Sequence, residues 1–219
     1  MLEVIGDTLS FAVGMLLSPF PVIVGLLILL SPTGTAGGVG FALGRLGGVG
    51  LVAVVAAALA EVITVETGSS LVSAVLRIVL GVALMGFAVV KWVRRPTGAD
   101  DVPGWMSSVE SKTPAGAAGL GFVVSTINPK ELAFSIGAGL TIGGAGLPLA
   151  ETVTVALGYT VIACASVIVP TVAFLVSRDR VVEPLGRART WLVRNNVTIA
   201  SVVLLIIGSL LIGGGLGDL

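Results

Sequence analysis

The sequence predicts an all-α membrane protein with six transmembrane helices, arranged as two inverted-topology three-helix repeats. Three observations support this prediction. Hydrophobic residues make up 55% of the 219 residues and charged residues 11%, with a mean hydropathy of +1.11. Six apolar segments are long enough to cross a bilayer, which takes about 20 mostly apolar residues. Finally, two proline-containing interruptions lie at matching places in the two halves of the chain.

The composition excludes several classes of protein. A chain with so few charged residues could not cover its apolar surface in water, so a soluble domain is excluded. The net charge is zero, so there is no basic field to attract nucleic acid. The 31 glycines lie within runs of Val, Leu and Ile, as is typical of membrane helices that pack through small residues.

The expected spans define two repeats and a loop. The spans are Leu9–Leu30, Ala36–Ala60, Ser69–Val90, Ala115–Leu147, Thr152–Val176 and Val197–Gly214. They are expected to be helices because an unpaired backbone cannot face lipid, and because they lack the alternation of barrel strands. One integral membrane domain would then contain a first repeat over residues 1–93, a cytoplasmic loop over 94–113 and a second repeat over 114–219.

The basic residues predict the orientation of the chain. Nine of them lie in the loops after spans three and five, which fall on the same side of the membrane: Lys91, Arg94, Arg95, Lys112, Arg178, Arg180, Arg187, Arg189 and Arg194. The opposite side has no Lys or Arg outside a span. The positive-inside rule therefore places these loops in the cytoplasm and both termini on the outer side of the membrane.

The second basic loop is expected to contain a short amphipathic helix. Its apolar residues follow a helical spacing, while Arg180, Arg187 and Arg194 share the other face. Such a helix would lie at the inner membrane surface with Trp191 near the headgroups. It would serve either as an anchor or to recruit anionic lipid.

Spans one and four are expected to be broken near the middle of the membrane. Ser18-Pro19-Phe20-Pro21 interrupts span one, and Asn128-Pro129-Lys130 interrupts span four. Proline removes an amide donor and clashes with the preceding turn, so each break frees backbone polar groups. Matched broken helices in opposed halves indicate the central site of a transporter. The alternative is that the prolines only kink the helices.

The helix after each break carries a matching motif, which is Leu43-Gly44-Arg45 in the first half and Leu157-Gly158-Tyr159 in the second. Small residues also recur four positions apart, at Gly40, Gly44 and Gly48 and again at Gly139 and Gly143. This spacing predicts close helix–helix contacts in a membrane.

Charged residues within the spans are candidates for the site, because each costs about 2.5–3.5 kcal/mol at a helix centre on insertion scales. Lys130 follows the second break directly and would either bind an anionic substrate group or form a structural ion pair with Glu131 or another helix. Arg45 would act in binding or extend its charged end to the cytoplasmic surface. Glu131 is the candidate proton carrier for ion coupling.

The candidate substrate-binding residues are Ser18, Pro19, Pro21, Arg45, Asn128, Pro129 and Lys130. The chain has no His, its single cysteine is Cys164, and no nucleotide-binding loop of the Gly-x4-Gly-Lys-Ser/Thr type occurs. We therefore expect no catalytic residue, no metal site and no cofactor.

These motifs resemble the lysine exporter (LysE) superfamily. The stretch from Trp105 through Thr113-Pro114 and Gly119-Leu120-Gly121 to Asn128-Pro129-Lys130-Glu131 is most similar to the actinobacterial GAP-type family, also called sulfolipid-1-addressing (Sap) proteins. The resemblance covers most of the chain. It implies an exporter fold and the movement of a cell-envelope lipid or another amphiphile.

Departures from other branches of the superfamily narrow this resemblance. Thiol-redox members need paired cysteines in the membrane, and nickel and cobalt exporters are rich in His. Amino-acid exporters typically carry Pro-Gly-Pro in span one, where this chain has Pro19-Phe20-Pro21. These differences favour the lipid-type branch.

Three functions remain open at this point. The first is secondary transport of an anionic lipid or amphiphile, with membrane lipids as partners and the protein alone, as a homodimer or in a lipid-export complex. The second is export of a small amino acid or cation. The third is a non-transporting accessory subunit of a lipid exporter.

Overall fold

The computed structural model describes residues 1–63, 70–93, 109 and 112–217, and the fold is given for those residues. They form helices and no strand, which confirms the predicted all-α class. The helices are α1 (Leu2–Leu16), α2 (Pro19–Leu29), α3 (Gly34–Ile63), α4 (Ser70–Val93), α6 (Pro114–Ile127), α7 (Pro129–Gly144) and α8 (Leu149–Gly217). Most of the expected loop over 94–113 lies outside the described residues.

Several helices are long and apolar enough to cross a membrane. Within the described residues these are Gly34–Ala60 of α3 and the run Leu149–Gly214 of α8, and the bent pair α1 and α2 is a third if it counts as one span. The shorter apolar helices include α6 and the second half of α4. These helices agree with a membrane-embedded protein.

Both predicted helix breaks are present. Helix α1 ends at Leu16, Ser18 is extended, and α2 begins at Pro19 with an angle of 54° between the two helices. Asn128 is extended too, and it ends α6 and begins α7. Its side-chain oxygen accepts a hydrogen bond from the Lys130 amide at 3.2 Å. Each break thus places proline at the first helical position, where its missing amide costs nothing.

Helix α8 consists of two helical segments joined at a kink. Its backbone leaves helical geometry at Ser177, with φ −148° and ψ 58°. This kink directly follows the end of the fifth expected span at Val176. The basic segment beyond it is helical, as expected, but it continues without a loop into the last expected span. The expected short surface helix is therefore the start of the second segment of α8.

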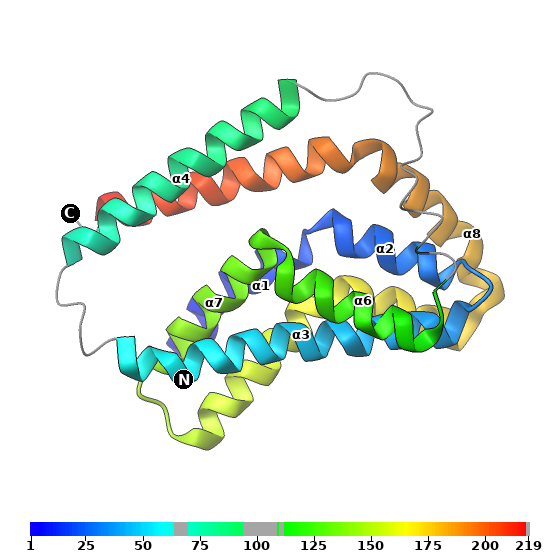
Figure 1. Ribbon diagram of the computed structural model, residues 1–219, viewed down its shortest axis with the longest axis horizontal. Coiled ribbons are helices and arrows are strands. Elements are labelled where there is room, and N and C mark those ends of the chain that lie inside the picture. Colours follow the sequence, from blue (N-terminus) through cyan, green and yellow to red (C-terminus); the bar gives the residue numbers. More distant parts are fainter. Residues whose placement is uncertain (64–69, 94–108, 110–111, 218–219) are drawn as a thin grey trace.

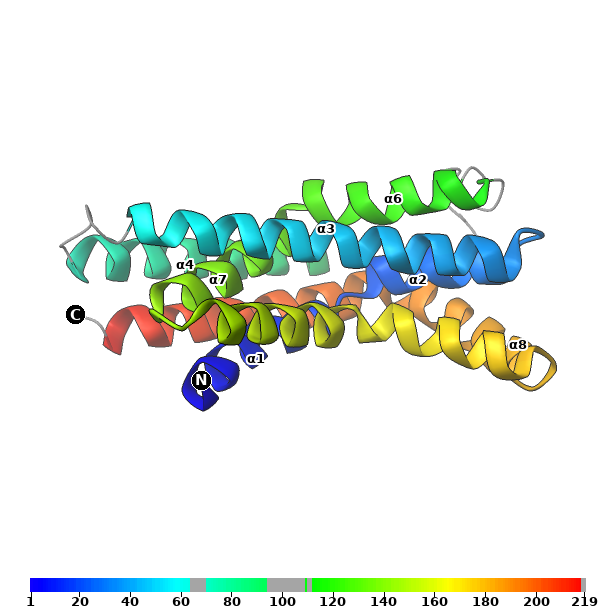
Figure 2. The same ribbon diagram turned by 90° about the horizontal axis from the view of Figure 1, so that it is seen from below.

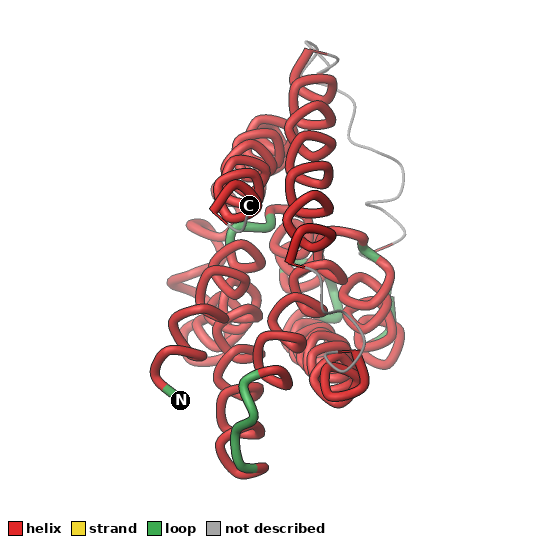
Figure 3. The backbone as a smooth tube through the Cα atoms, turned by 90° about the vertical axis from the view of Figure 1, so that its left-hand side faces the viewer, coloured by secondary structure: helices red, strands yellow, loops and turns green. Residues whose placement is uncertain are grey.

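The helices form a bundle with an outlying pair (Figure 1). Helices α2, α6, α7 and the first segment of α8 pack against α3, which runs the length of the bundle (Figure 2), and α1 packs against α7 and α8. Helix α4 packs against the second segment of α8, where Gly81 and Gly208 face each other. Figure 3 shows the molecule along its long axis.

The predicted small-residue contacts are confirmed. Along α3, a Cβ atom added at any of three glycines would meet a backbone carbonyl oxygen of α6: Gly40 faces Pro114, Gly44 faces Ala118 and Gly48 faces Phe122. Farther along α3, the carbonyl oxygens of Ala53 and Ala57 lie against Gly139 and Gly143 of α7. Close approach of α3 to both parts of the second broken helix therefore depends on residues without side chains.

Candidate functional site

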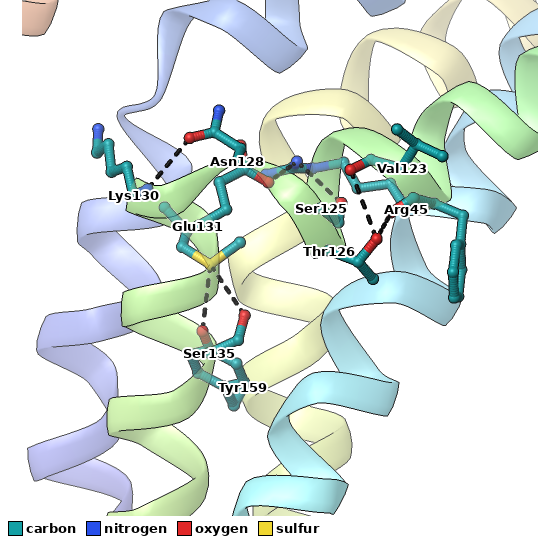
Figure 4. Close-up of polar contacts among 11 residues, drawn as sticks. Arg45, Val123, Ser125, Thr126, Asn128, Lys130, Glu131, Ser135 and Tyr159 are labelled. Atoms are coloured by element: carbon teal, nitrogen blue, oxygen red, sulfur yellow. Dashed lines mark hydrogen bonds and ion pairs between the residues drawn. The ribbon is translucent and has the colours of Figure 1, made fainter.

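The centre of the candidate site is an ion pair between Arg45 of α3 and Glu131 of α7 (Figure 4). Both side chains are 0% exposed. The Glu131 carboxylate lies in the first turn of α7, directly after the break at Asn128. Arg45 therefore does not extend its charged end to the surface, and that alternative for it is wrong.

The ion pair is only partly satisfied by hydrogen bonds. Nη1 of Arg45 donates to Glu131 and also, at 3.3 Å, to Oγ of Ser125 on α6. Among the described residues, Nε and Nη2 of Arg45 and Oε1 of Glu131 are buried without a hydrogen-bond partner. Such atoms are costly in a low-dielectric interior. The pair therefore keeps unused capacity to bind a further polar group.

About one helical turn along α7 from the ion pair, Met15 at the end of α1 forms hydrogen bonds with two other helices. Its sulfur atom accepts hydrogen bonds from Tyr159 of α8 at 3.2 Å and from Ser135 of α7 at 3.6 Å. All three side chains are buried. Ser135 lies one turn after Glu131, so the end of α1 comes level with the first turns of α7.

Lys130 lies apart from the ion pair. Its ammonium nitrogen is 5.7 Å from the centre of the Phe134 ring, and the side chain extends away from Arg45 (Figure 4). Glu131 is paired with Arg45, and the described residues contain no ion pair of Lys130. The predicted alternative, a structural ion pair between Lys130 and Glu131, is therefore wrong.

The candidate residues of the first break are buried on α2. Ser18 is 3% exposed, and Pro19 and Pro21 form the first turn of the helix. Within the described part of the chain, no hydrogen bond joins the Ser18 side chain to Arg45 or Glu131. The structure thus brings Arg45 and Glu131 together beside the second break, while Ser18, Pro19 and Pro21 stay in the other broken helix.

Sequence reasoning missed two residues of the site. Ser125 and Met15 carried no signal beyond their places just before the two breaks. Tyr159 follows Leu-Gly in the second half of the chain, as Arg45 does in the first half. The structure shows that the two residues also make corresponding contacts. Arg45 bonds a residue beside the second break, and Tyr159 bonds a residue beside the first.

Comparison with known proteins supplies the family. Residues 8–217 match the family described as Sap, sulfolipid-1-addressing protein. The chain belongs to this family. The match covers both helix breaks and the Arg45–Glu131 pair, so the whole site lies in the family region. It confirms the resemblance to Sap proteins inferred from the motifs. No curated protein and no solved structure matches the chain.

Membership links this Sap-family chain to sulfolipid addressing and, with its apolar helices, to a membrane. The described residues contain no cluster of three or more metal-binding side chains. The chemistry of the site is that of a buried cation and a buried carboxylate, with a second cation, Lys130, set apart from them at the start of α7.

Proposed function

We propose that the protein is a secondary transporter of the lysine-exporter type, which moves a cell-envelope lipid or another anionic amphiphile across the bacterial cytoplasmic membrane. The observation that carries this proposal is the fully buried Arg45–Glu131 pair at the break between α6 and α7. Ionisable side chains inside a membrane are costly and usually serve transport or proton movement. The family's link to sulfolipid addressing supplies the substrate class.

The proposed architecture is six spans in two inverted repeats. In it, α1 with α2, α3 and α4 form the first repeat, and α6 with α7 and the two segments of α8 form the second. The contacts of Arg45 and Tyr159 support this arrangement. Arg45, in the first half, bonds a residue beside the break of the second half, and Tyr159, in the second half, bonds a residue beside the break of the first. Paired broken helices surround the substrate site in transporters of this kind.

In this proposal, Glu131 couples transport to protons. While Glu131 is ionised, it holds Arg45 and joins the two repeats. Protonation removes the negative charge, and the guanidinium of Arg45, which already has two nitrogens without partners, becomes free for an anionic headgroup. Loss of the proton restores the ion pair and displaces the headgroup. Because the proton and the headgroup bind together and leave together, they cross the membrane in the same direction, and a proton gradient of that direction drives the lipid. Lys130 supplies the second positive charge.

The test is transport by the purified protein in liposomes with a proton gradient. A fluorescent, singly charged anionic lipid should move between leaflets faster than in liposomes that contain the Glu131→Gln protein, and dissipation of the gradient should slow it. A neutral analogue should not be accelerated. Acceleration of both lipids alike, or of neither, would contradict a selective exporter, and the second result would favour an accessory subunit.

A further inference from the structure

A groove runs along the outer face of α1. Its volume is about 310 Å³, and it lies between α1 and the second segment of α8. It is lined by Gly6, Leu9, Ser10, Val13, Gly14, Leu17, Val203, Ile206 and Ile207. Ser10 is the one polar side chain in this set, so the groove is suited to a hydrocarbon chain.

Two glycines of α1, Gly6 and Gly14, are part of the groove wall. A Cβ atom at Gly6 would meet nothing within 4 Å, so the groove is open there. At Gly14 the Phe134 ring lies directly behind the backbone, 2.9 Å from where a Cβ would be. From Gly6 to Leu17 the helix rises by about 16 Å. The lining residues of the groove thus follow α1 to the first helix break.

The register of α1 against α7 places a cation at one end of this groove. Val4 packs against the cluster that contains Ile142, and Met15 contacts Ser135, so the two helices run in opposite directions. Lys130, which precedes Ser135 by little more than one turn, is therefore level with the end of α1, at Leu17.

Lys130 is a cation without an ion-pair partner among the described residues, and it lies against the Phe134 ring, which packs on Gly14 of the groove wall. A charge inside the apolar region is costly unless it is paired or hydrated. An anionic group at the Leu17 end of the groove would supply that pairing. The charge of Lys130 thus distinguishes an anionic amphiphile from a neutral lipid as the occupant.

We propose that this groove holds the acyl chain of an anionic lipid whose headgroup lies beside Lys130. The proposal rests on the exporter function above and deepens it, because it names where the substrate enters. The acyl chain stays in the groove on the lipid-facing side of α1, and the headgroup lies beside Lys130 at the helix breaks. Hydrocarbon and charge are thus held by different parts of the protein.

The test uses a tryptophan in the groove wall and lipids with brominated chains, which quench tryptophan fluorescence on contact. The probe is Ile206→Trp in a protein whose three native tryptophans are replaced by Phe. The matched probe is Val169→Trp, on the first segment of α8, where an apolar side chain is also exposed. Bilayers contain either brominated phosphatidylglycerol, which is anionic, or brominated phosphatidylcholine, which is zwitterionic.

At Ile206→Trp, phosphatidylglycerol should bind about fivefold more tightly than phosphatidylcholine, the preference that one basic group supplies near an anionic lipid. At Val169→Trp the two lipids should quench alike. Lys130→Met should abolish the preference at the groove. Gly6→Leu should reduce quenching by both lipids, because its side chain fills the groove, whereas Gly86→Leu, which also enters open space, should not.

Equal quenching by the two lipids at Ile206→Trp, or a preference that survives Lys130→Met, would overturn the proposal. These outcomes are separable from failure of the exporter function. If the protein transports the lipid but shows no lipid preference at the groove, the exporter function stands and the proposed groove site is wrong. If the preference depends on Lys130 but the protein transports no lipid, the lipid site stands and the exporter function is wrong.

Discussion

Glu131 is adjacent to Lys130 in the chain, but its carboxylate pairs with Arg45, which lies 86 positions away. The pair joins α3 to α7 and is fully buried. It separates the two cations of the site into different roles. Arg45 has a buried carboxylate partner, and Lys130 has no ion-pair partner among the described residues.

The first prediction concerns the stability of this pair. Arg45→Met or Glu131→Leu alone should lower the free energy of unfolding by about 3–5 kcal/mol, because each leaves an uncompensated buried charge. The double variant should recover most of that loss, since neither charge remains. Unfolding in detergent is measured for the original protein, the two single variants and the double variant, which together form a double-mutant cycle. Additive losses in the double variant would show that the two side chains are not coupled.

The second prediction concerns Lys130. Lys130→Met keeps the apolar stem and removes the charge, so transport of the anionic lipid should be lost while the protein unfolds at nearly the same denaturant concentration. Lys130→Arg should be only partly tolerated, because a planar guanidinium does not replace a compact ammonium. Both variants are compared by transport in liposomes and by unfolding in detergent. Full transport by a well-folded Lys130→Met protein would remove this residue from the mechanism.

The third prediction concerns the packing of α3 on α6. Gly44→Ala places a methyl group against the carbonyl oxygen of Ala118, so the helices must separate at a cost of about 1–3 kcal/mol. Gly47→Ala, three positions along the same helix, enters open space and should stabilise the protein by up to about 1 kcal/mol through helix propensity. Thermal unfolding of the two variants provides the comparison. Equal stability would argue against close packing of these helices.

The fourth prediction concerns orientation. In a Cys164→Ala background, cysteines at Glu3 and Glu66 should react with a membrane-impermeant reagent added to intact cells, and cysteines at Thr97 and Arg189 should not. The reason is that nine basic loop residues are expected on the cytoplasmic side and none on the other. The opposite labelling pattern would reverse the direction of transport.

The helix breaks and the glycine contacts were predictable because their causes are local. Pro19 and Pro129 each lack the amide that would continue the preceding helix and crowd its last turn, which favours a break there. The four-residue spacing of Gly40 and Gly44 puts both on one side of a helix in any fold. The start of the second segment of α8 was less predictable, because the basic residues after Ser177 are compatible both with a separate surface helix and with a continuous one.

Hydropathy, prolines and small residues thus determine that this chain is helical, suited to a membrane and broken beside Ser18 and Asn128. They do so because each acts through its own helix and the lipid around it. Only the tertiary structure decides that Arg45 is buried against Glu131, that Tyr159 meets Met15 and that Lys130 lies against the Phe134 ring. Those contacts depend on which helix faces lie against one another, and the energy of a buried charge depends on the atoms that other helices bring to it.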